Sequence, residues 1–166
     1  MNLTITRTTI GDADDLREIR LLALRDEPDA YGSTYEESRR YPRSQWVQMA
    51  TEWNYYLARS NADVVGMASG GLFPPFPAAR WLYGMFVRAE YRGTGVALEL
   101  VRAVATWTRA ADVSTLGLHV TTTVTRAAGF YTKIGFEPVG DPEPMIRDPS
   151  LRLQTMTTDL VTNGVL

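Results

Sequence analysis

The stretch FVRAEYRGTGVALELV, residues Phe86–Val101, decides the fold of this chain. An apolar run ends near its start and apolar positions recur at helical spacing from Ala97 on, which predicts a strand, a tight turn and a helix. The turn carries Arg92, Gly93 and Gly95. N–H groups at the start of a helix are unpaired, and the helix dipole favours negative charge there. Because glycine lets an anion approach those groups and arginine attracts it, the turn predicts an anion site.

Two common phosphate-binding loops fit this turn poorly. The nucleoside-triphosphate loop needs a lysine directly after its last glycine, and no lysine follows Gly95. The dinucleotide fingerprint needs a glycine or alanine three residues after its second glycine, where this chain has Leu98. Taken alone, the turn is also compatible with a plain connection between a strand and a helix.

The composition of the 166 residues excludes several classes of protein. There is no cysteine and one histidine, so disulfides, thiolate nucleophiles and zinc clusters built from these residues are excluded. The net charge of -2 gives no basic excess for nucleic acid, and no apolar run approaches the ~20 residues of a membrane helix. We therefore expect one cytoplasmic domain over residues 1–166, with no metal, no nucleic-acid partner and no membrane anchor.

Hydrophobic periodicity predicts strands and helices along the whole chain, first as an antiparallel meander and then as strand, helix, strand, helix, strand. The proline-rich segment Phe73–Pro77 is expected to be a surface loop, and a second loop with prolines follows residue 139. The expected strands are 3–8, 55–59, 64–72, 81–87, 116–120, 136–139 and 152–160. The expected helices run from Ala13 until Pro28, over 45–51, from Ala97 onward and over 125–134.

Two motifs give the chain a family resemblance. The hexamer Arg92-Gly93-Thr94-Gly95-Val96-Ala97 resembles the Arg/Gln-x-x-Gly-x-Gly/Ala signature of the GCN5-related N-acetyltransferase (GNAT) family. Further along, AAGFYTKIGFEPVG, residues 127–140, is similar to the second hallmark of that family, A-x-x-x-Y-x-K-x-GF followed by a strand. Residues 27–33 resemble a common bacterial branch of these enzymes. Two motifs in the right order are more specific than either alone.

The resemblance implies an α/β fold with a mixed, mostly antiparallel sheet of six to seven strands, flanked by helices. The fourth and fifth strands would be parallel and parted to admit coenzyme A. It also implies an N-acetyltransferase that moves the acetyl group of acetyl-CoA to a primary amine by direct attack. The amine would belong to a small molecule or a peptide, and a homodimer is a further expectation from the family.

The resemblance also implies roles for single residues. The backbone of the strand end would pair with the pantetheine arm, the hexamer would hold the pyrophosphate, and Tyr131 would lie near the thioester sulfur. A phenol is suited to act as general acid to the departing thiolate, because the two groups have comparable basicity. The expected coenzyme-binding residues are Met85, Phe86, Val87, Arg92, Gly93, Thr94, Gly95, Val96 and Ala97.

Two departures from the family pattern leave an alternative open. Val124 stands where the family usually has an asparagine, so a polar contact to the cofactor is lost unless Thr123 or Thr125 replaces it. The strand 82–87 has no carboxylate, whereas some members place a general base there. A non-catalytic acyl-CoA-binding sensor or regulatory protein would fit both departures, and a transferase of a longer acyl group is a weaker alternative.

Candidates for a general base must come from other segments. His119 has a suitable pKa and lies on the strand 116–120, with side-chain parity opposite to that of Leu118. Glu27, Glu36 and Glu37 lie in the region that forms the acceptor wall in the family. A single strand histidine is more often a packing residue and loop carboxylates are usually solvated, so a base carried by water, or no base, is equally plausible.

The acceptor itself is not fixed by the sequence. The slight acidity would suit a cationic amine such as a polyamine, an aminoglycoside or a protein N-terminus, but a net charge of -2 is too small to choose. Several aromatic residues could shape an acceptor pocket, although most aromatic residues pack in a core or at its edge. These residues are Tyr31, Tyr35, Trp46, Trp53 and the loop Phe73–Pro77.

Overall fold

A computed structural model describes residues 2–166. The strands are β1 Leu3–Arg7, β2 Asn54–Ser60, β3 Asp63–Gly71, β4 Arg80–Val87, β5 Thr115–Thr121, β6 Glu137–Pro144 and β7 Arg152–Asp159. The α-helices are α1 Ala13–Asp26, α2 Tyr35–Ser38, α3 Arg43–Glu52, α4 Val96–Ala110 and α5 Thr125–Lys133. Short 3-10 helices are η1 Ile10–Asp12, η2 Pro28–Ala30 and η3 Ala89–Tyr91. Within residues 2–166, no helix combines the length and the apolar character needed to cross a bilayer.

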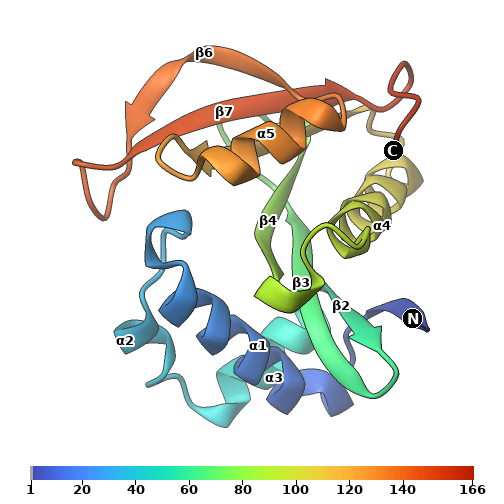
Figure 1. The fold of residues 1–166 in the computed structure, drawn as a ribbon, viewed down its shortest axis with the longest axis vertical. Coiled ribbons are helices and arrows are strands. Elements are labelled where there is room, and N and C mark those ends of the chain that lie inside the picture. Colours follow the sequence, from blue (N-terminus) through green and yellow to red (C-terminus); the bar gives the residue numbers. More distant parts are fainter. Residues whose placement is uncertain (1) are drawn as a thin grey trace.

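All seven strands form one sheet in the order β1-β2-β3-β4-β5-β7-β6. Every neighbouring pair is antiparallel except β4 and β5, which are parallel, so the predicted mixed, mostly antiparallel sheet is confirmed. Helices α1 and α3 lie on one side of β3 and α4 lies on the other (Figure 1). One core fills the space beneath α1 and α3, and a second core lies beneath α4 and α5.

Strands β4 and β5 pair over three residues only, Arg80–Leu82, and then part. The cause lies in β4, where Gly84 and Met85 together face the single residue Ala68 of β3. This bulge places Gly84 at φ 60, a backbone angle that favours glycine. A bulge bends its strand and strengthens the local twist, so β4 turns away from β5. The predicted parting of the fourth and fifth strands is confirmed.

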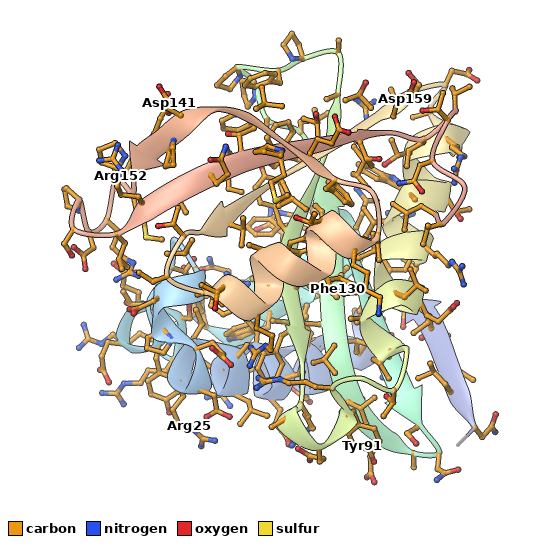
Figure 2. All side chains as sticks on the ribbon, turned by 45° about the horizontal axis from the view of Figure 1, so that its top comes forward. Arg25, Tyr91, Phe130, Asp141, Arg152 and Asp159 are labelled. Carbon is orange, nitrogen blue, oxygen red and sulfur yellow. The ribbon has the colours of Figure 1, made fainter. Side chains whose placement is uncertain are left out.

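The prediction of a loop from residue 140 on is wrong for residues 140–144, which belong to β6, and is confirmed for residues 145–151. Strand β6 continues to Pro144, past Pro138 and Pro142, and it pairs with β7 across an irregularity between Val139 and Glu143. Because β6 is the edge strand of the sheet, a proline that lacks an N–H group can be accommodated there. Figure 2 shows Asp141 of β6 and Arg152 of β7 at the same end of this hairpin, with Asp159 at the far end.

A glycine in β5 gives a test of this packing. A Cβ atom at Gly117 would overlap the ring of Trp81, which is fully buried against it, so Gly117→Ala is expected to lower the free energy of unfolding by about 1–3 kcal/mol. The control is Gly129→Ala in α5, where nothing lies within 4 Å of the added carbon, and a gain of about 0.5–1 kcal/mol is expected. Denaturation in urea measures the free energy of unfolding of both variants. Equal effects of the two substitutions would contradict the packing.

Candidate active site

A cleft of about 880 Å³ lies where β4 and β5 part. Its walls come from both cores of the protein. Tyr31 and Tyr55 belong to the core beneath α1 and α3, whereas Leu118 and Tyr131 belong to the core beneath α4 and α5. The cleft therefore connects the two faces of the sheet, and groups bound on opposite faces can meet inside it.

The glycine turn before α4 has the geometry of an open anion cradle. Gly93 and Gly95 have φ angles of 79 and 93, and nothing lies within 4 Å of a Cβ atom built on either. The helical hydrogen bonds of α4 begin with the N–H of Glu99, which donates to the carbonyl of Gly95 over 3.1 Å. The N–H groups of residues 96–98 precede that bond and are free for a ligand. The turn has the open space and the backbone donors that the predicted phosphate site needs.

Arg92 is held at the entrance of this turn. Its Nη2 donates to Oε1 of Glu27 over 2.8 Å and its Nε donates to the carbonyl of Val87 over 3.1 Å. Arg126 of α5 donates to the same Glu27 oxygen over 2.9 Å. Glu27 thus bridges two guanidinium groups, leaving one net positive charge beside the turn. Its carboxylate borders a smaller pocket and not the cleft, which makes it a poor base.

The edge of β4 that β5 leaves open is the edge where the pantetheine arm is predicted to bind. The carbonyl of Met85 accepts a hydrogen bond from the Tyr31 hydroxyl over 2.9 Å, and that of Val87 accepts from Arg92. Both carbonyls therefore point to the open side of the strand. Phe86 lies between these two residues on the strand, and its side chain is buried in the core beneath α1 and α3. A ligand along this edge meets Tyr31 and Arg92 as well as the backbone.

Tyr131 lies in the wall of the cleft, on α5. Its ring packs edge-on against Phe136 at 5.7 Å between ring centres. Burial raises the pKa of Tyr131 well above its usual value, so the phenol carries its proton at neutral pH, as an ordinary tyrosine does, and holds it more tightly. Burial also raises the pKa of Tyr31, with Tyr131 adding to the rise and Arg20 opposing it. Both residues therefore lie close enough to Tyr31 for charge interactions.

His119 of β5 also lines the cleft, but its Nδ1 already has a partner. The indole Nε1 of Trp81 donates to this nitrogen over 3.2 Å, so the proton of the neutral ring belongs on Nε2. Burial lowers the pKa of His119, and the carboxylate of Glu143 opposes that shift. The ring is therefore neutral at pH 7, and its lone pair is engaged.

The remaining base candidates are placed away from the cleft-lining residues. The Glu37 carboxylate accepts from the N–H of Thr34 over 3.1 Å, closing a capping box at the start of α2. Glu36 pairs with Arg39 over 2.8 Å on the surface. Neither carboxylate belongs to the cleft wall, and both have a local structural role.

Some of the remaining candidate residues line the cleft and others do not. Val124 lines both the cleft and the smaller pocket beside Glu27, whereas Thr123 and Thr125 border the smaller pocket alone. Of the aromatic residues, Tyr31 and Trp53 line the cleft; Trp46 is buried in the core and Tyr35 is partly exposed on α2. Phe73 and Phe76 stack on each other and cover Trp81, with ring centres 4.8 and 5.4 Å from its own.

Arg20 of α1 is the cleft-wall residue that matters most among those that sequence reasoning did not single out. It lies four residues after Leu16 and three before Ala23, both of which are fully buried, so it falls on the apolar side of the helix. A charged residue at that spacing is the signal that could have identified it. A charge on the buried side of a helix is uncommon without a partner.

Comparisons with known proteins give the family and the fold of the chain. The model of the acetyltransferase (GNAT) family matches residues 16–136. Among solved structures, yncA from Salmonella typhimurium, determined with its cofactor acetyl-CoA, has a TM-score of 0.75 and 17% identity over 96% of this chain and 95% of its own. A ribosomal-protein-alanine N-acetyltransferase from Brucella melitensis has a TM-score of 0.73 and 22% identity over 95% and 99%. The paia N-acetyltransferase from Thermoplasma acidophilum, in complex with coenzyme A, has a TM-score of 0.71 and 17% identity over 96% and 99%. None of the curated protein sequences matches this chain significantly.

Proposed function

Because this chain belongs to the acetyltransferase (GNAT) family, we propose that it transfers the acetyl group of acetyl-CoA to a primary amine of a small molecule or peptide. The observation that carries this proposal is the cleft at the parting of β4 and β5, with Tyr131 in its wall. The bound cofactor of the Salmonella typhimurium structure, which shares the fold, supports acetyl-CoA as the donor.

The open glycine turn is the natural seat for the diphosphate of the coenzyme. Amides of residues 93–97 would donate to it, and Arg92 would contribute charge from its position beside Glu27. The pantetheine arm would follow the free edge of β4 at Met85 and Val87, which leads into the cleft. This path brings the thioester toward Tyr131.

Transfer requires one bond to form and one to break. The amine nitrogen attacks the acetyl carbon, the C–S bond breaks, and the sulfur takes the electron pair and a proton. Tyr131 is proposed to supply that proton from its hydroxyl group, which burial keeps protonated. The amine would lose its own proton to water, since the lone pair of His119 is engaged by Trp81 and no carboxylate of β4 is available. A chain without cysteine offers no thiol for a covalent intermediate.

A direct experiment tests the proposed activity. The purified protein is mixed with acetyl-CoA and a panel of primary amines. The free thiol of the released coenzyme is measured with a colorimetric thiol reagent, and the acetylated product is identified by mass spectrometry. Thiol release that depends on an amine, together with the acetylated amine, is expected. Coenzyme binding without any product from the panel would instead favour the acyl-CoA-binding sensor.

Substitution of His119 tests whether a base is needed there. Loss of a general base typically lowers the rate by 10²- to 10⁴-fold, whereas His119→Gln is expected to lower kcat/KM by less than about tenfold. Because the pKa of His119 is lowered, its protonation would affect the rate only on the acid side of the usual histidine range. We expect the pH profile of the variant to keep the shape of the wild-type profile. Disappearance of an acidic limb in the variant would identify His119 as the base.

A further inference from the structure

The guanidinium of Arg20 lies in the cleft wall without a carboxylate partner among the described residues. Its Nη2 donates to the Ser33 hydroxyl over 3.2 Å, and its Nε is buried with no hydrogen-bond partner. Nη1 faces the bulge of β4, 3.6 Å from where a Cβ of Gly84 would lie. An arginine keeps its positive charge at neutral pH, and here the hydroxyl group of Ser33 is the acceptor that receives a hydrogen bond from it.

Two other half-buried arginines of this protein are compensated by carboxylates. Arg59, whose side chain is 19% exposed, pairs with Asp12 over 2.7 Å and with Asp15 over 2.8 Å. Arg92 pairs with Glu27. An unpaired charge that is withdrawn from water is costly unless a partner of opposite charge compensates it. Arg20 therefore has the surroundings of a binding residue and not those of a structural ion pair.

The charges of the cleft wall favour an anion as a whole. The wall contains two arginines, Arg20 and Arg80, and one carboxylate, Glu52. Arg80 lies over the ring of Trp107 at 5.8 Å, and Glu52 is an exposed residue that accepts a hydrogen bond from Gln48 over 2.9 Å. A polyamine or an aminoglycoside would thus place its extra positive charges beside two guanidinium groups. The local charge of the cleft is opposite in sign to the net charge of the chain.

We propose that Arg20, assisted by the hydroxyl of Ser33, binds a carboxylate of the acceptor, so that the acceptor is an amino acid. This inference rests on the proposed acetyl transfer and names its substrate class. The guanidinium fork matches a carboxylate in two parallel hydrogen bonds, which fixes the orientation of the acceptor as well as its charge.

The position of Arg20 suits this role because it lies at the point where the strands part. Ser33 and Gly84, which flank the guanidinium, both line the cleft, as does the nearby Tyr31. The Tyr31 hydroxyl donates to the carbonyl of Met85 on β4, and Tyr131 lines the same cleft. An acceptor held by its carboxylate at Arg20 would therefore extend its amine toward the proposed thioester position.

The test compares amines that differ only in the anion. The standard L-amino acids, their carboxamides and spermidine are each supplied with acetyl-CoA to the wild-type protein, and kcat/KM is measured by thiol release. We expect at least one amino acid to be acetylated roughly 10- to 100-fold more efficiently than its own carboxamide, the range that a charged hydrogen bond contributes. Spermidine is expected to be a poor acceptor.

Variants then assign the effect to Arg20. In Arg20→Gln the preference for the amino acid over its carboxamide should disappear, with an unchanged affinity for coenzyme A. Arg20→Lys keeps the charge without the fork and should retain part of the preference. This second variant keeps the test valid if Arg20→Gln does not fold. Arg17→Gln is the matched control, because Arg17 lies on the exposed side of the same helix and should change nothing.

The outcomes separate this inference from the proposed function. Acetylation of carboxamides or spermidine as fast as amino acids, or a preference that persists in Arg20→Gln, would overturn the carboxylate role while the transferase activity stands. If no amine is acetylated, thermal shifts with amino acids in the presence of coenzyme A decide. If amino acids stabilise the wild-type protein but not Arg20→Gln, the carboxylate site is supported and the transferase activity is not. If amino acids stabilise neither protein, the carboxylate site is contradicted.

Discussion

Replacing Tyr131 by phenylalanine is expected to lower kcat for acetyl transfer by about 10²- to 10⁴-fold, the usual contribution of a general acid. The dissociation constant for coenzyme A should change by less than about twofold, because the ring and its packing against Phe136 remain. A large loss in kcat without a loss in binding is the pattern of an interaction made only in the transition state. The raised pKa of Tyr131 adds a further expectation, since the acid should remain active at pH values above the usual tyrosine range.

Single-turnover kinetics and calorimetric titration with coenzyme A measure these two quantities. Tyr56→Phe is the matched control, because Tyr56 lies on β2 and is not part of the cleft wall. It should retain the wild-type rate. A Tyr131→Phe protein that acetylates an accepted amine at full rate would remove the proposed acid role, and the departing thiolate would then have to take its proton from water.

The second large effect concerns the glycine turn. Gly95→Val is expected to weaken the binding of coenzyme A by more than about 100-fold, the loss that follows when several charge-assisted hydrogen bonds are disturbed together. Gly95 has a φ of 93 at the N-cap of α4, and a branched side chain would both strain this angle and obstruct the open space in front of the turn. The substitution would distort the backbone of the turn and would also block the approach of the diphosphate to its N–H groups.

Gly140→Val separates strain from binding. Gly140 also has a positive φ, 67, and open space around its Cβ position, but it lies on β6 away from the cleft wall. Both variants should lose similar stability on denaturation, whereas only Gly95→Val should lose coenzyme affinity in a calorimetric titration. Equal affinities of the two variants would place the diphosphate elsewhere.

The local parts of this structure were predictable from the sequence because short-range rules decide them. The strand, turn and helix of residues 86–101 follow from periodicity and glycine, and they form β4, η3 and α4 in the structure. The boundary of β6 was not predictable in the same way. Its prolines indicate a loop until the topology shows that the strand is an edge.

The site was less accessible to sequence reasoning, because its partners are far apart in the chain. Glu27 is 65 residues from Arg92 and 99 from Arg126, and only the fold reveals that it bridges them. His119 and Trp81 are 38 residues apart, so the hydrogen bond that occupies the histidine was equally hidden. The place of Arg20 in the cleft wall had a local signal in the sequence, because Arg20 lies one helical turn after the buried Leu16.

A crystal structure of the protein with coenzyme A tests the central claim most directly. The diphosphate should accept hydrogen bonds from backbone amides of residues 93–97, and the sulfur should lie beside the Tyr131 hydroxyl, inside the opening between β4 and β5. A coenzyme seated at another helix, or a sulfur on the side of the sheet away from Tyr131, would contradict the proposed mechanism.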